Sequence, residues 1–105
     1  MEFAELPSFT KRLADRVSDE DYRQLQLILI ENPEYGSLIS GGGGLRKVRI
    51  KASGRGKSGG ARVIYYWFVD DHQIFFLDVY SKNEKSDLTK RELRELVTIL
   101  KELKQ

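Results

Sequence analysis

The sequence predicts an α+β domain with a small, antiparallel-rich sheet and helices packed on one face. Three observations lead to this prediction: helical spacing of apolar residues in the first third of the chain, strand-like segments between residues 45 and 82, and a capped amphipathic helix at the end. The elements are ordered β-α-α-β-β-β-α, which is typical of an α+β fold. A length of 105 residues leaves room for one domain, residues 1–105, around one core.

The N-terminal segment predicts a short edge strand followed by a helix. Residues 2–6 read EFAEL and are suited to the strand. Residues 8–16 then predict a helix, because Phe9 and Leu13 stand four apart and therefore share one face.

A second helix is expected to begin after Ser18. The Ser18 hydroxyl is suited to the N-cap, and acidic residues follow in the first turn, where the helix dipole favours them. The helix ends at Asn32, because Pro33 disfavours helical geometry in the residue before it. Its apolar face is expected to comprise Tyr22, Leu25, Ile28 and Leu29.

The first strand of the central sheet is predicted over residues 45–52, after a loop over residues 34–44 that ends in four glycines. Its residues alternate, with Val48 and Ile50 toward the core. The opposite face then carries Leu45 and a basic row made of Lys47, Arg49 and Lys51.

Two more strands follow a glycine-rich connection over residues 53–60. Residues 62–69 are almost wholly apolar, which predicts a central strand buried on both faces. Residues 70–72 form a hairpin turn into a strand over residues 73–82. In that strand, strict alternation puts Phe75, Leu77 and Val79 on one face, and Ile74, Phe76, Asp78, Tyr80 and Lys82 on the other.

The chain ends in a predicted amphipathic helix. Thr89 and Glu92 have the spacing of a capping box, in which each side chain bonds the backbone of the other residue. The apolar stripe of this helix comprises Leu93, Leu96, Val97, Leu100 and Leu103.

Positive charge is concentrated in residues 46–62. This 17-residue stretch holds seven of the 18 Lys and Arg residues and none of the 16 Asp and Glu residues. It carries +7, and since the net charge is +2, the other 88 residues carry −5. A dense cluster of one sign repels itself unless an anion compensates it. Phosphate is a common partner for Arg and Lys, so the stretch predicts a phosphate-containing ligand.

The composition excludes several classes of protein. The chain has no cysteine, which excludes disulfides, thiol catalysis and thiolate metal sites. The acidic start MEFAELPSF does not resemble a signal peptide, and no apolar run approaches the roughly 20 residues of a membrane span. We therefore expect a cytoplasmic protein that does not contact a membrane. We expect no metal site, because no group of His, Asp and Glu residues has metal-ligand spacing.

Two glycine patterns do not predict nucleotide sites. Residues 54–59 match G-x-G-x-x-G, but that motif binds dinucleotides only when a helix follows it, and here a strand follows. The Gly-Lys-Ser of residues 56–58 lacks the first P-loop glycine, since Lys51 stands in its place. His72, the single histidine, is interpreted as a solvated turn residue.

Three stretches carry a family resemblance. Residues 31–36 read ENPEYG, residues 43–67 read GGLRKVRIKASGRGKSGGARVIYYW, and residues 77–89 read LDVYSKNEKSDLT. In order and spacing they resemble the RelE/HigB superfamily of bacterial toxins, most closely its HigB-like branch, across nearly the whole chain. GxRVIYY followed by YxKNE is specific when both occur at this separation.

The resemblance implies a microbial-ribonuclease-like, RelE-like toxin fold. It further implies a ribosome-dependent endoribonuclease that cleaves mRNA in the ribosomal A site without a metal or cofactor, by attack of the RNA 2′-hydroxyl. The implied partners are the 70S ribosome, mRNA and a cognate antitoxin that often carries a helix-turn-helix. The free toxin is expected to be a monomer.

The resemblance also assigns site residues. Arg62 occupies the position of the family's phosphate-binding arginine. Lys82 and Lys85 are candidates for binding the scissile phosphate or stabilising the leaving group. Tyr80 is expected to stack on a base or relay a proton, and Glu84 to act as base or pair with a neighbouring lysine.

A second group is expected to bind nucleic acid. Lys47, Arg49 and Lys51 match the family's basic strand and are candidates for binding mRNA and ribosomal RNA. Arg55 and Lys57 are expected to contact ribosomal RNA.

The chain departs from some relatives at the catalytic centre. It has no histidine there, Asn83 stands where some relatives carry arginine, and Thr89 falls near the position of a catalytic tyrosine. Two alternatives therefore stay open: a gyrase-poisoning toxin of the ParE kind, and a non-catalytic RNA- or ribosome-binding module. Relatives of the ParE kind usually lack the basic row, which argues against the first alternative.

Overall fold

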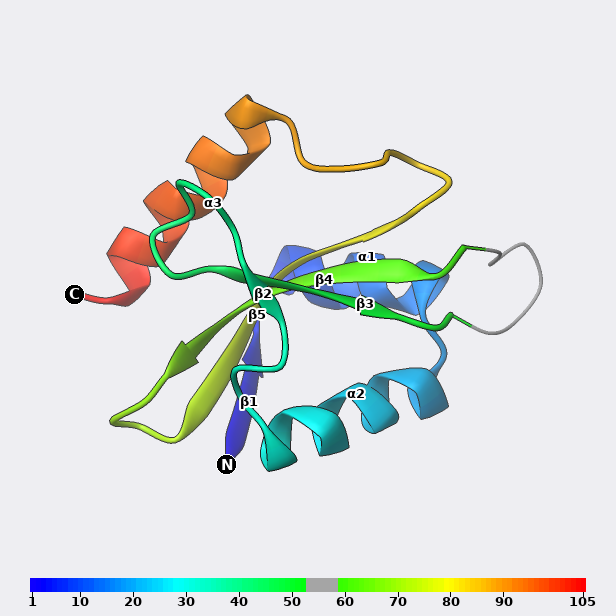
Figure 1. The fold of residues 1–105 in the computed structure, drawn as a ribbon, viewed down its shortest axis with the longest axis horizontal. Helices are drawn as coiled ribbons and strands as arrows, with labels where there is room; N and C mark the ends of the chain where they lie inside the picture. The colour runs from blue at the N-terminus through cyan, green and yellow to red at the C-terminus, as the bar shows by residue number, and fades with distance from the viewer. Residues whose placement is uncertain (53–58) are drawn as a thin grey trace.

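The computed structural model describes residues 1–52 and 59–105, and within them it shows one five-stranded sheet and three helices (Figure 1). In chain order the elements are β1 (Glu2–Glu5), α1 (Pro7–Arg16), α2 (Asp19–Glu31), β2 (Ser37–Leu38), β3 (Arg46–Ile50), β4 (Ala61–Phe68), β5 (Gln73–Ser81) and α3 (Lys90–Leu103).

The sheet has the strand order β1-β5-β4-β3-β2. The pairs β2–β3, β3–β4 and β4–β5 are antiparallel, whereas the edge strand β1 runs parallel to β5. The predicted α+β class with an antiparallel-rich sheet is therefore confirmed. The loop predicted over residues 34–44 contains one addition, β2, whose two residues are too few to show an alternating pattern.

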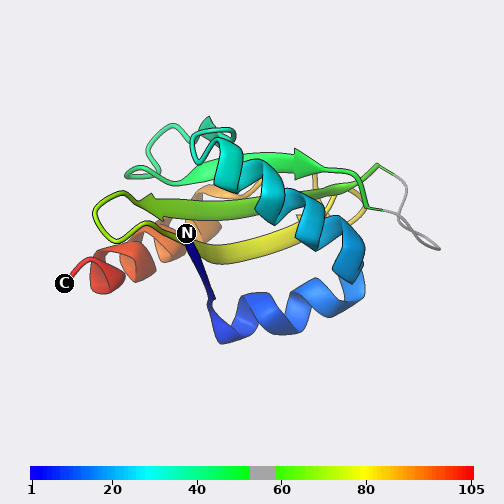
Figure 2. The same cartoon turned by 90° about the horizontal axis from the view of Figure 1, so that it is seen from below.

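Helices cover both faces of the sheet, so the expectation that they all pack on one face is wrong. In Figure 2, α2 crosses in front of the strands and α3 passes behind them. One core contains Phe9, Leu25 and Leu29 from α1 and α2 with Val63, Tyr65 and Phe76. The other contains Leu96 and Leu100 from α3 with Leu45, Ile64, Leu77 and Tyr80. Because β4 is apolar on both sides, each side must be covered.

A β-bulge in β5 corrects the predicted faces of that strand. The pairing with β4 shifts between Ile64 and Tyr65, whose partners are Asp78 and Phe76, so Leu77 is an extra residue. An extra residue inverts the alternation beyond it. Phe75, Leu77 and Tyr80 consequently face α3, whereas Ile74, Phe76 and Val79 face α1 and α2.

The helix ends follow the sequence closely. Ser18 Oγ accepts a hydrogen bond from the Asp21 backbone N–H at 3.1 Å, and α2 ends at its C-cap, Asn32. Leu25 and Leu29 are buried as predicted, but Ile28 is 38% exposed. It lies at the margin of the apolar face and lines a cavity against β3. No helix among residues 1–52 and 59–105 is long and apolar enough to cross a bilayer.

Candidate functional site

Arg62 is the only buried charged residue among those that the structure describes, with 6% of its surface exposed. It is the second residue of β4, in register between Arg49 of β3 and Tyr80 of β5. Its Nη1 donates a hydrogen bond to the Gly59 carbonyl oxygen at 3.1 Å. No described carboxylate pairs with it. A buried cation without an anionic partner is costly, so this guanidinium is suited to a bound anion.

Two other cations accompany Arg62, and neither pairs with a carboxylate within the described part of the chain. Arg49 is its cross-strand neighbour and is exposed. The Lys82 side chain lies against Gly59, where an added Cβ would come within 3.1 Å of Lys82 Cδ. Arg49 is paired with Arg62 across the strands, and Arg62 and Lys82 both contact Gly59. We refer to these three residues as the Arg62 cluster.

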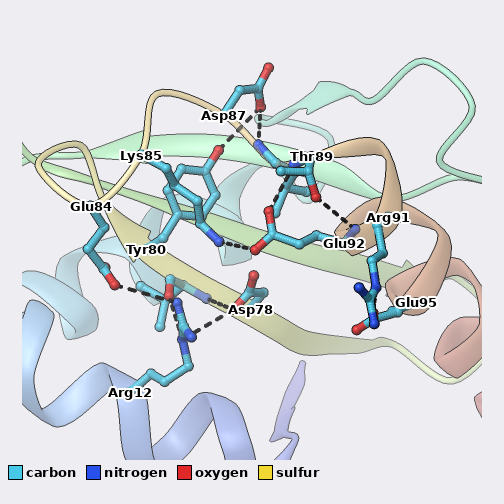
Figure 3. Close-up of polar contacts among 12 residues, drawn as sticks. Arg12, Asp78, Tyr80, Glu84, Lys85, Asp87, Thr89, Arg91, Glu92 and Glu95 are labelled. Atoms are coloured by element: carbon cyan, nitrogen blue, oxygen red, sulfur yellow. Dashed lines mark hydrogen bonds and ion pairs between the residues drawn. The ribbon is translucent and has the colours of Figure 1, made fainter.

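Tyr80 is fully buried, so its ring is not free to stack on a base in this structure. Its hydroxyl donates to Asp87 Oδ1 at 3.4 Å (Figure 3). Burial and then the charge of Asp87 raise the pKa of Tyr80 to about 12. The phenol therefore stays protonated at neutral pH and is suited to donate a proton rather than to accept one.

Asp87 is a site residue that the sequence interpretation missed. Its Oδ1 lies 3.1 Å from Lys47 Nζ and also accepts the backbone N–H of Leu88 at 2.8 Å. The hydrogen bond from Lys47 is the largest cause of the lowered pKa of Asp87. Asp87 thus joins β3, β5 and the segment before α3. The sequence offered no specific signal for this role, because an acid two residues ahead of the N-cap Thr89 is also favoured by the helix dipole.

Lys85 is engaged on two sides. Its Nζ forms an ion pair with Glu92 Oε2, and it lies 5.2 Å from the centroid of the Tyr80 ring (Figure 3). Glu92 also completes the predicted capping box, since it accepts the Thr89 backbone N–H at 2.8 Å while its own N–H donates to Thr89 Oγ1 at 3.0 Å. The terminal helix therefore fixes Lys85 beside Tyr80 but leaves it less available for phosphate.

Glu84 binds α1, and none of the lysines that the structure describes pairs with it. Its two carboxylate oxygens accept hydrogen bonds from Arg16 at 2.6 and 2.7 Å, and one also accepts the Ser81 backbone N–H at 2.8 Å. The bond from Arg16 is the main reason that the pKa of Glu84 falls to about 2. So acidic a group is a weak proton acceptor, which disfavours Glu84 as a general base.

Neither Lys51 nor His72 forms a hydrogen bond or an ion pair with Asp87 or Tyr80. Lys51 follows the end of β3 and lines a cavity of about 350 Å³ together with residues of α2. Arg55 and Lys57 lie outside the described residues. His72 is exposed in the β4–β5 turn, as predicted, at the opposite end of β4 from Arg62.

The arrangement favours binding of a phosphate diester. Arg62, Arg49 and Lys82 supply cationic donors, while Lys47 and Lys85 are neutralised by Asp87 and Glu92. Fixed donors of this kind stabilise charge that develops on a phosphoryl group. Within residues 1–52 and 59–105, no three His, Asp or Glu side chains form a group that could hold a metal ion.

Two comparisons with known proteins bear on the fold and the family of this chain. The structure of a mutant of the E. coli toxin RelE, in the free state, is similar in fold with a TM-score of 0.57, at 17% sequence identity over 81% of this chain and 86% of that one. The family model described as the RelE toxin of the RelE/RelB toxin–antitoxin system matches residues 11–105. The chain therefore belongs to the RelE family of toxins of toxin–antitoxin systems.

Proposed function

We propose that this toxin is a ribosome-dependent endoribonuclease that cleaves mRNA in the ribosomal A site and is neutralised by a cognate antitoxin. It would act in the cytoplasm, where ribosomes and mRNA are found. Membership of the RelE family supports a toxin whose target is translation. The HigB-like branch, suggested by residues 77–89, stays a prediction.

One observation carries the nuclease proposal: Arg62 is buried, positively charged and without a carboxylate partner among the described residues. A side chain held in this way is costly for the free protein and gains its compensating charge only when an anion binds. The scissile phosphate of RNA, next to Arg49 and Lys82, is the anion that this cluster fits.

In the proposed reaction the RNA supplies its own nucleophile. The 2′-oxygen attacks the adjacent phosphorus, the bond to the 5′-oxygen of the next nucleotide breaks, and a 2′,3′-cyclic phosphate forms. The attacking hydroxyl loses a proton and the leaving oxygen gains one. The Arg62 cluster would stabilise the added negative charge of the pentavalent phosphorane. Tyr80, protonated at neutral pH, would hold Asp87 and Lys47 beside it.

The other basic residues are proposed to hold the complex. Lys51 is exposed near the end of β3, where it could meet RNA that runs past Arg49. Arg55 and Lys57, outside the described residues, keep their predicted role in contacting ribosomal RNA. Positioning by the ribosome would supply part of the catalysis, because correct orientation of the 2′-oxygen lowers the barrier by itself.

The test is induced expression in a bacterial host, followed by primer-extension mapping of 5′ ends on a reporter mRNA. The same reporter with its start codon destroyed serves as the untranslated control. We expect new 5′ ends in phase with codons on the translated message only.

Other outcomes would point elsewhere. Growth arrest with intact mRNA and cleaved DNA would support a gyrase poison. Arrest with both nucleic acids intact would support a module that blocks the ribosome without cutting. Equal cleavage of translated and untranslated message would overturn the ribosome requirement while leaving a nuclease.

A further inference from the structure

A cavity of about 360 Å³ lies beside the Lys47–Asp87 ion pair. It is bounded by β2 and the residues that follow it, by the segment before α3, and by the first turn of α3. We call it the β2–α3 cavity. Its volume falls within the range of roughly 300–1,000 Å³ that small-molecule sites occupy. Because Lys47 and Asp87 form part of its wall, a group bound there would remain next to the candidate site.

The lining of this cavity combines apolar walls with two hydroxyl groups. The apolar surface comes from Leu38, Ile39, Leu88 and Leu93. Ser37 and Ser40 also line it, and neither side chain has a hydrogen-bond partner among the described residues. Apolar walls with a few polar groups that fix orientation are characteristic of small-ligand sites. A nucleobase has that chemistry, since its faces are weakly polar and its edge carries donors and acceptors.

The wall of the cavity is held in place by the backbone. The Gly42 N–H donates to the Ile39 carbonyl at 2.9 Å, and the Ile39 N–H donates to the Leu45 carbonyl at 3.0 Å. Gly44 has φ of 106°, and a Cβ there would lie 2.8 Å from the Tyr66 ring, so only glycine allows this approach. The segment that carries Ser40 is therefore fixed against the sheet before any ligand binds.

We propose that the β2–α3 cavity binds a nucleobase of the mRNA next to the cleaved phosphate and sets a base preference for cleavage. This inference rests on the proposed nuclease function. A single-stranded message can turn one base out of its stack, and recognition of unstacked bases is the usual mode of sequence-specific RNA binding. The base would pack between the apolar side chains, with Ser37 and Ser40 bonding its edge and Lys47 near its phosphate.

Two variants test the proposal. Ser40→Trp fills the cavity from an exposed position, and the double variant Ser37→Ala with Ser40→Ala removes only the hydroxyls. Thr98→Trp is the matched control, because Thr98 is exposed on α3 and lines a different cavity. Each is expressed with the translated reporter, and the bases flanking every 5′ end are counted. Thermal melts check that the variants fold.

We expect the parent and Thr98→Trp to share one distribution of bases at the cut. Ser40→Trp should reduce cutting most at the preferred base. The double alanine variant should reduce the ratio of cutting at the preferred base to cutting at other bases by about 3–10-fold, which is the effect of losing one or two hydrogen bonds. If the double alanine variant has the same distribution of bases at the cut as the parent, the proposal is wrong. The proposal is also wrong if a Ser40→Trp variant that still cuts has that same distribution. If only neutralisation by the antitoxin is lost, the cavity belongs to the antitoxin interface and the proposal is wrong.

Failure of the underlying function has a different signature. A parent protein that leaves no new 5′ ends on any message would refute the nuclease itself, and the base subsite with it. A parent that cuts translated mRNA, with variants that cut at the same positions and frequencies, would refute the subsite alone.

Discussion

At the scale of single residues, the candidate site depends on which cations already have a carboxylate partner. Lys47 pairs with Asp87 and Lys85 with Glu92, whereas Arg62 is buried and pairs with no described carboxylate. An ion pair near the surface screens its cation from an incoming phosphate. The charge of Arg62 is therefore left for the proposed substrate, as are the charges of the exposed Arg49 and Lys82.

Replacing Arg62 with Ala should abolish most of the proposed cleavage. A lost electrostatic donor at such a site typically costs about 10²–10³-fold in rate, and ribosome binding should persist because the other basic residues remain. The measurement is the yield of 5′ ends per translated message, together with co-sedimentation with ribosomes. Arg91→Ala is the matched control, since the Arg91 side chain is 84% exposed and its one carboxylate partner among the described residues is Glu95. Full toxicity of Arg62→Ala would show that the site is assigned wrongly.

At the scale of elements, α1 is tied to the segment after β5 through Glu84. The guanidinium of Arg16 bonds both of its oxygens, while Arg12 bonds the Val79 carbonyl at 3.0 Å and lies 3.4 Å from Asp78. These contacts join elements that are more than 60 residues apart in the chain. They position the turn between Tyr80 and Lys85, so α1 supports the site without contributing to it.

The Glu84 contact predicts a specific loss of stability in acid. Its pKa in the folded protein is about 2, below its ordinary value of 4.5, so the folded state binds fewer protons than the unfolded state between these values. This contribution is complete above about pH 4.5 and is lost as the pH falls toward about 2. Lowering the pH from about 5 to about 2.5 should therefore decrease the free energy of unfolding of the parent more than that of Glu84→Gln. Urea unfolding at each pH measures this difference.

The comparison of Glu84→Gln with its parent isolates this one carboxylate, because Asp87 and Glu92 keep their lowered pKa values in both proteins. Parallel stability curves over that pH range would contradict the pairing with Arg16.

The capping box of α3 predicts a second stability effect. Thr89→Ala removes the acceptor for the Glu92 N–H and should lower the free energy of unfolding by about 1 kcal/mol. Thr98→Ala on the same helix is the control, expected within about 0.5 kcal/mol of the parent because Thr98 is exposed and its hydroxyl bonds the Arg94 carbonyl of its own helix. Equal effects of the two substitutions, measured by urea unfolding, would show that the cap does not stabilise α3.

At the scale of the whole molecule, helices cover both faces of the sheet but leave the basic end open. The α3 core reaches Tyr80, whereas Arg49 and Lys82 beyond it remain exposed. The net charge of +2 is small, so we expect the concentration of +7 in residues 46–62 to govern the proposed binding of RNA.

Binding to single-stranded RNA should consequently weaken with salt, in proportion to the number of phosphates contacted. Arg49→Ala should reduce the slope of log affinity against log salt by about 0.7, the value for one phosphate contact on a single strand. Fluorescence anisotropy with a labelled oligonucleotide measures this slope. Arg91→Ala should leave it unchanged, and an equal change in both variants would show that Arg49 makes no special contact.

The sequence by itself determined the α+β class, the extent of the helices and the central position of residues 62–68. These features depend on local signals: the Ser18 and Thr89 caps, Pro33, and apolar periodicity. The family resemblance, too, needed only the order of short motifs, and the RelE family is shown over residues 11–105.

Only the tertiary structure decided which faces and which partners these residues have. The extra residue Leu77 directs Tyr80 toward α3. The sequence around Leu77 contains no pattern that predicts this bulge. The pairing of Glu84 with Arg16, and of Asp87 with Lys47, joins residues 68 and 40 positions apart. Such contacts, like the burial of Arg62, depend on how the whole chain packs. They cannot be predicted from periodicity, because the spacing of apolar residues indicates local structure and not which distant residues meet.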